Sequence, residues 1–128
     1  MADQLARPRV LLVDDELLNR KTFGRAFRRE YDICTTHSGV EALALLRQVS
    51  FDVIFIDFCM DDMDGIELAR QARLLRPRVA CVMLTGYPDS PEVQAASAEG
   101  ILDAVLCKPW RRDDIEKWVS VAQSRSPS

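Results

Sequence analysis

Four short hydrophobic segments along this chain are each followed at once by a polar residue with useful chemistry. They are residues 9–13 before Asp14 and Asp15, 53–56 before Asp57, 79–84 before Thr85, and 104–107 before Lys108. Each segment has the length and composition of a buried strand. In an open parallel sheet the carboxyl ends of the strands share one edge, where ligands bind. The sequence therefore predicts one site that gathers three carboxylates, a hydroxyl and an ammonium group.

Amphipathic helical patterns alternate with these strands, and a further short strand is expected over residues 31–36. The helices are expected over residues 17–30, from Ser38 to before Phe51, over 65–75, from Ser90 to Gly100, and from Asp113 onward. Ser38 with Glu41, and Asp113 with Glu116, have the spacing of N-terminal caps. Ser90 before Pro91 predicts another helix start, and Gly100 predicts the end of that helix.

The expected inward faces follow from helical spacing. In the second helix these are Val40, Leu43 and Ala44, and in the last helix Ile115, Trp118, Val119 and Ala122. Five strand–helix units with right-handed crossovers favour a doubly wound α/β fold, a parallel sheet between two layers of helices. We expect one domain over residues 1–123 and a loose polar tail over 124–128.

Composition excludes several classes of protein. The net charge of −3 and the pI near 5.2 give no basic footprint for direct nucleic-acid binding. No apolar run approaches the ~20 residues that span a bilayer, and the N-terminus lacks a signal-peptide core, so we expect no membrane contact and a cytoplasmic location. The cysteines show no metal-binding spacing, and those within the expected strands, Cys34, Cys81 and Cys107, are expected to be buried.

The predicted carboxylate cluster indicates a cation site. Two carboxylates ~4 Å apart repel by about 4 kcal/mol at an effective dielectric near 20, so Asp14, Asp15 and Asp57 are hard to explain by packing. A few oxygen ligands with room for water and phosphate favour Mg²⁺. Asp57 is the candidate nucleophile toward phosphorus, because a neighbouring cation would screen the repulsion from the donor. Lys108 and Thr85 suit phosphoryl oxygens.

These residues resemble the receiver domain of two-component response regulators. The resemblance rests on Asp14-Asp15-Glu16, on Asp57 followed by Met63-Asp64-Gly65, on Thr85-Gly86-Tyr87 and on Lys108-Pro109, which occur in the family's order. It implies a flavodoxin-like (βα)5 fold with strand order 2-1-3-4-5.

The resemblance also implies the site and its partners. Asp57 would accept a phosphoryl group from a sensor histidine kinase or phosphotransfer protein; Asp15, Asp57 and the backbone carbonyl of Cys59 would bind Mg²⁺, with Asp14 acting through water. Lys108, Thr85 and backbone amides near Cys59 and Gly86 would contact the phosphoryl oxygens. A cis Lys108–Pro109 bond is implied as well. The face formed by the fourth helix, fifth strand and fifth helix would control an output domain or partner protein, or form a phosphorylation-dependent homodimer. The chain would be a signalling protein and not an enzyme, acting only on its own phosphorylation and dephosphorylation.

The chain departs from the family pattern in the switch region. Family members often carry an aromatic residue where this chain has Val105, so the usual coupling of that residue to the threonine is in question. Tyr87 and Trp110 are candidates to replace it, or are packing residues. Asp61 stands where a proline is common, which predicts a more mobile loop.

Two other interpretations stay open from the sequence. An aspartate-based phosphatase would use similar residues, but its Asp-x-Asp motif is absent because Cys59 occupies the second position. A receiver-like module that binds a partner constitutively, without phosphorylation, is the alternative of a different class.

Overall fold

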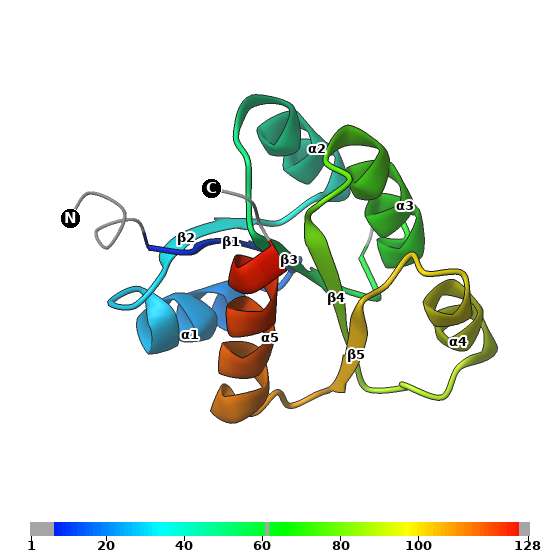
Figure 1. Cartoon of the computed structure of the whole chain (residues 1–128). Coiled ribbons are helices and arrows are strands. Elements are labelled where there is room, and N and C mark those ends of the chain that lie inside the picture. The colour runs from blue at the N-terminus through cyan, green and yellow to red at the C-terminus, as the bar shows by residue number, and fades with distance from the viewer. Residues whose placement is uncertain (1–6, 61, 126–128) are drawn as a thin grey trace.

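The computed structural model describes residues 7–60 and 62–125, and the expectations for Asp61 and for residues 126–128 lie outside this part of the chain. Its core is a five-stranded parallel sheet in the order β2-β1-β3-β4-β5 (Figure 1). The strands are β1 (Arg9–Val13), β2 (Asp32–Thr36), β3 (Val53–Asp57), β4 (Ala80–Thr85) and β5 (Ala104–Cys107). The helices are α1 (Leu17–Phe27), α2 (Gly39–Gln48), α3 (Gly65–Leu75), α4 (Pro91–Ala98) and α5 (Arg112–Arg125). The predicted doubly wound fold and strand order are confirmed.

Helices cover both faces of the sheet (Figure 1). α1 and α5 pack on one face, where Phe23, Phe27, Ile115 and Val119 join inward side chains of the strands. α2, α3 and α4 pack on the other face. β1, β3 and β4 are buried almost throughout, as strands between two layers of helices must be.

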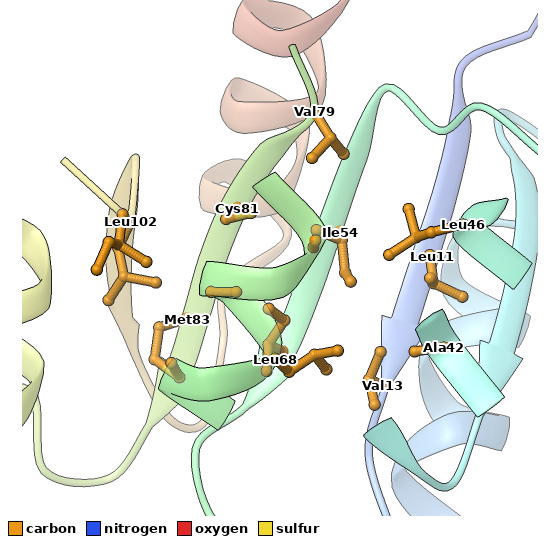
Figure 2. Close-up of a cluster of buried hydrophobic side chains, with 14 of the residues drawn as sticks. Leu11, Val13, Ala42, Leu46, Ile54, Leu68, Val79, Cys81, Met83 and Leu102 are labelled. Carbon is orange, nitrogen blue, oxygen red and sulfur yellow. The ribbon is translucent and has the colours of Figure 1, made fainter. Parts of the chain in front are cut away.

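Figure 2 shows the core beneath α2, α3 and α4. Alternate residues of adjacent strands supply one side of it: Leu11 and Val13 from β1, Ile54 from β3, and Cys81 and Met83 from β4. The helices supply the other side through Ala42, Leu46 and Leu68, which are fully buried. Each fully buried valine, leucine, isoleucine or methionine side chain contributes about 1.5–3 kcal/mol to stability. This packing fixes the strands whose ends carry the site.

Two predicted helix starts are confirmed. The Ser90 side chain accepts the Val93 N–H before Pro91, and α3 begins at Gly65 after Asp64, whose carboxylate accepts the Ile66 N–H. Gly100 follows α4 with a positive φ of 81°, which glycine adopts without strain.

Three details of the helix predictions were wrong. Glu41 completes no reciprocal cap on Ser38, because its carboxylate accepts from the Thr36 hydroxyl instead, although Ser38 does accept the Glu41 N–H. Asp113 lies in the first turn of α5 and is not its cap, since the helix begins at Arg112. The inward face of α2 is Ala42, Leu43 and Leu46, whereas Val40 and Ala44 are exposed.

Element boundaries also differ from expectation. α1 ends at Phe27, three residues early, because the Phe27 carbonyl accepts from the N–H groups of both Glu30 and Tyr31 as the chain turns toward β2. α5 continues through Ser124 and Arg125. Of the cysteines expected to be buried, Cys81 is buried and Cys34 and Cys107 are exposed. Within the described residues, no helix combines the length and apolar character needed to cross a membrane.

Candidate functional site

The carboxyl ends of β1 and β3 bring three aspartates together. One carboxylate oxygen from each of Asp14, Asp15 and Asp57 lies within 4.8 Å of the other two. β1 and β3 are hydrogen-bonded neighbours with Val13 opposite Ile56, so the residues that follow these partners meet at the sheet edge. Asp14 and Asp57 are buried and Asp15 is half-buried. Like charges this close in a protected position are the arrangement that a divalent cation stabilises.

The first turn of α1 holds Asp14 in place. Its Oδ1 accepts the Glu16 N–H at 2.9 Å, and the Asn19 side-chain amide donates to its Oδ2 at 3.2 Å. The Arg20 guanidinium donates to the Asp14 backbone carbonyl at 2.7 Å. The Asp14 oxygens are therefore already engaged with protein donors, which suits contact with a cation through water.

Asp57 and Lys108 form an ion pair across the sheet. Lys108 Nζ donates to Asp57 Oδ1 at 2.8 Å, with 30% of the lysine and 7% of the aspartate side chain exposed. Burial, together with the charge of Asp14, raises the pKa of Asp57 above its ordinary value, although Lys108 opposes the shift. Burial alone would lower the pKa of Lys108, but the hydrogen bond and charge of Asp57 outweigh it and raise that pKa. The lysine therefore stays charged and remains hydrogen-bonded to the Asp57 carboxylate.

Thr85 and Gly86 lie beside this pair. Thr85 ends β4 and is buried; its hydroxyl oxygen accepts the Tyr87 N–H at 2.9 Å, and its carbonyl accepts the Lys108 N–H at 2.9 Å. Its neighbour Leu84 is the register partner of Asp57. Gly86 is exposed in the loop after β4, and Cys59 is exposed in the loop after β3. The structure thus gathers all the predicted site residues at one sheet edge.

The loop after β3 is anchored at two points. A Cβ atom added to Gly65 would lie 2.8 Å from the Asp57 carbonyl oxygen and 3.2 Å from Phe58 Cα, so only glycine allows this close approach. Further along, the Asp62 carboxylate accepts the N–H groups of Gly39 at 3.1 Å and Val40 at 3.2 Å, at the start of α2. Burial alone would raise the pKa of Asp62, but these hydrogen bonds hold it below its ordinary value.

Neither aromatic candidate takes the place of the residue missing at Val105. The Tyr87 side chain is 74% exposed. Trp110 packs against Phe23 and Phe27, with ring centroids 5.6 and 5.5 Å apart, in the core beneath α1 and α5. Val105 is half-buried and packs against the core on the other face of the sheet, beneath α2, α3 and α4. The Lys108–Pro109 bond between these regions is cis, as the resemblance implied.

Sequence reasoning missed three residues around the site: Asn19 and Arg20, which hold Asp14, and Asp62, which anchors the loop. It quoted Glu16 as part of a motif but gave no role to its side chain, which Asn19 contacts. The available signal was an amide and a guanidinium in the first helical turn after an acidic pair, where side chains reach back toward the preceding strand end.

Comparisons with known proteins agree with this geometry. The family model of the response regulator receiver domain matches residues 10–120. The transcriptional regulatory protein GlrR of Escherichia coli is 30% identical over 118 residues, covering 91% of this chain and 26% of that protein. The hydrogenase transcriptional regulatory protein HoxA of Cupriavidus necator is 31% identical over 115 residues, covering 90% of this chain and 23% of that protein. The chain thus spans about a quarter of the length of these curated relatives.

A solved structure shares the whole fold. The CheY-like response regulator receiver domain protein of Methanospirillum hungatei superimposes with a TM-score of 0.85 at 30% identity, covering 94% of this chain and 97% of that one. The chain belongs to the response regulator receiver domain family of two-component signalling proteins, and it carries an acidic pocket at Asp14, Asp15 and Asp57.

Proposed function

We propose that this domain accepts a phosphoryl group on Asp57 from a histidine kinase or phosphotransfer protein, in a reaction that depends on Mg²⁺. The observation that carries the proposal is the buried Asp57 carboxylate, 2.8 Å from Lys108 Nζ and within 4.8 Å of the ligand oxygens of Asp14 and Asp15. The proposed nucleophile Asp57, the metal-binding carboxylates of Asp14 and Asp15, and the Lys108 ammonium thus lie at one edge of the sheet.

The chain's own residues perform the transfer as follows. An Asp57 carboxylate oxygen attacks the phosphorus of a phosphohistidine, an acyl phosphate bond forms, and the P–N bond breaks with its electron pair passing to the imidazole, which takes up a proton. Lys108 then moves from the carboxylate to a phosphoryl oxygen. The Thr85 hydroxyl donates its proton to another, since its oxygen already accepts from Tyr87. Backbone amides near Cys59 and Gly86 complete the contacts.

The donor set fits Mg²⁺. Asp15, Asp57 and the Cys59 carbonyl would hold the ion, with Asp14 contacting it through water because its oxygens already accept from Glu16 and Asn19. When bound, the ion supplies charge neutralisation between the carboxylates and the incoming phosphoryl oxygens.

Phosphorylation would act on the face formed by α4, β5 and α5. A phosphoryl group adds a charge of about −1.5 to −2 beside Thr85 and Lys108 and draws both inward. These residues end β4 and follow β5, and they lead into α4 and α5. The group therefore favours one pre-existing arrangement of that face, which would control an output domain, a partner protein or a homodimer. With Val105 half-buried in the core and Tyr87 exposed, the displacement of Thr85 would pass through the backbone of the β4–α4 loop.

α1 offers a docking surface for the phosphodonor. Lys21, Arg25, Arg28 and Arg29 lie on its solvent side or just beyond its end, and among the described residues none of them forms an ion pair. Leu17 and Leu18 beside them are 56% and 72% exposed. On an acidic protein this surface suits an acidic partner with an apolar centre.

Intact mass spectrometry tests the proposal. The protein is incubated with acetyl phosphate or phosphoramidate, with Mg²⁺ or with chelator, beside Asp57→Asn. We expect one phosphoryl adduct that requires both Mg²⁺ and Asp57. In parallel, a phosphoryl-mimicking beryllium fluoride complex should raise the melting temperature of the wild type and leave Asp57→Asn unchanged. Failure of both the adduct and the fluoride complex would contradict the proposal and favour a constitutive binding module. Steady release of phosphate over many turnovers would favour a phosphatase.

A further inference from the structure

Asn19 ties two acidic side chains together beside the candidate site. Its side-chain amide donates to Glu16 Oε1 at 3.0 Å and to Asp14 Oδ2 at 3.2 Å. Glu16 in turn donates its backbone N–H to Asp14 Oδ1 at 2.9 Å. An exposed glutamate ordinarily spreads its charge over several rotamers. Here an amide anchored on buried Asp14 holds the Glu16 carboxylate in one place.

The Glu16 side chain lines a cavity that Asp14 of the acidic cluster also lines. The cavity has a volume of about 480 Å³, and its lining includes Asp14, Glu16, Asn19, Lys108 and Trp110. Glu16 and Lys108 both line this cavity, so the Glu16 carboxylate borders the same space as the lysine that would contact the phosphoryl group. Glu16 therefore places a fixed negative charge beside the proposed phosphoryl site, and it is not among the proposed ligands of the cation.

We propose that Glu16, held by Asn19, is a specificity-determining residue for the phosphodonor, which makes the site discriminate against strongly anionic small donors. The inference rests on the proposed function. A fixed charge beside the site repels each donor in proportion to the donor's negative charge. Acetyl phosphate is a dianion at neutral pH, whereas phosphoramidate carries a protonated nitrogen and less net negative charge. A phosphohistidine on a docked partner would be least affected, since docking on α1 holds it in place.

The magnitude of the effect follows from the exposure of Glu16. Its charge acts through water, so its removal should change the rate for a donor carrying one more negative charge by about two- to fivefold. At 1 M salt the screening length falls to about 3 Å, and the discrimination should largely disappear.

The experiment compares initial phosphorylation rates with acetyl phosphate and with phosphoramidate at saturating Mg²⁺ and low ionic strength. The ratio of the two rates cancels any change in the metal site that affects both donors equally. We expect Glu16→Gln to raise the acetyl phosphate to phosphoramidate ratio by about two- to fivefold. Asn19→Ala, which frees Glu16 but keeps its charge, should shift the ratio in the same direction by less.

Glu99→Gln is the matched control. It removes the same charge from the end of α4, at the opposite edge of the sheet, where Glu99 pairs with Arg70 on the surface. The ratio should be unchanged in this variant, and the shift in Glu16→Gln should vanish at about 1 M salt.

The outcomes separate this inference from the proposed function. An unchanged ratio in Glu16→Gln, or an equal shift in Glu99→Gln, would overturn the role of Glu16 while leaving phosphorylation intact. A ratio unchanged in Asn19→Ala would overturn the part played by Asn19. No uptake by the wild type from either donor, together with no binding of beryllium fluoride, would overturn the proposed function and this inference with it.

Discussion

The Lys108 ammonium lies 2.8 Å from the Asp57 carboxylate, joining residues that are 51 positions apart in the chain. This contact exists because β3 and β5 flank β4 and all three strands run in the same direction. The ion pair stabilises a buried charge in the resting protein, and the same lysine is the group that would meet an incoming phosphoryl oxygen. One contact therefore links the stability of the site to its proposed chemistry.

Lys108→Met should lower the free energy of unfolding at pH 7 by about 1–2 kcal/mol, because it leaves the Asp57 carboxylate without its cation. In an Asp57→Asn background the same substitution should change stability by only a few tenths of a kcal/mol. Urea denaturation of the four proteins in chelator measures the coupling. Equal losses in both backgrounds would show that Lys108 stabilises the fold through its aliphatic stem alone.

Asp14→Asn should weaken Mg²⁺ binding and yet raise the stability of the metal-free protein by about 1 kcal/mol, because it removes one of three mutually repelling carboxylates. Asparagine can still accept the Glu16 N–H through its side-chain oxygen. Thermal unfolding in chelator and calorimetric titration with Mg²⁺ check the two effects. A lower melting temperature in chelator, with Asp89→Asn as an exposed control, would contradict the account of the cluster.

Gly65→Ala should destabilise the protein by about 1–3 kcal/mol, because the new Cβ would collide with the backbone of Asp57 and Phe58 and displace the loop of the site. Gly24→Ala is the matched comparison. Nothing lies within 4 Å of a Cβ at Gly24 inside α1, so alanine there should stabilise by about 0.5–1 kcal/mol. Chemical denaturation of both variants gives the signs, and a neutral Gly65→Ala would refute the steric requirement.

Asp103 should make stability fall at acidic pH. Burial alone would raise its pKa, but hydrogen bonds from the Cys81 N–H, Arg125 and Arg73 hold the pKa below the ordinary value of 3.8. A lowered pKa in the folded state contributes stability that is present above the ordinary value and is lost as the pH falls through the folded pKa. Asp103→Asn should therefore lower the free energy of unfolding by about 1–3 kcal/mol at pH 7. The loss should become smaller as the pH falls below about 4.

Urea denaturation of wild type and Asp103→Asn over this pH range measures the difference. A gap that stays constant from neutral to acidic pH would mean that the charge of Asp103 contributes nothing to its role between α3, β4 and α5.

The sequence predicted the features that depend on short-range pattern. Local chemistry predicts where the strands end and where two helices start, α3 at Gly65 and α4 at Pro91. The parallel topology then brings the residues that follow or end the strands, Asp14, Asp57, Thr85 and Lys108, to one edge of the sheet.

Side-chain orientation was less predictable. In α2 the residues Val40, Ala42, Leu43, Ala44 and Leu46 are all apolar, so two inward faces were compatible with the pattern and packing against β1 and β3 decided between them. The contacts of Asn19 depend on how the chain turns after Asp15. The pattern of α1 continued to Glu30, but tertiary connection to β2 ended the helix at Phe27.

We propose that Asp57 carries the phosphoryl group, and locating the acyl phosphate in the chain shows which residue is phosphorylated. Borohydride reduces an acyl phosphate on aspartate to homoserine, so protein exposed to phosphodonor and Mg²⁺ is reduced, digested and mapped by peptide mass. We expect homoserine at position 57 alone, and none when chelator replaces Mg²⁺. Homoserine at Asp14 or Asp15, or a modified peptide that persists in Asp57→Asn, would contradict it.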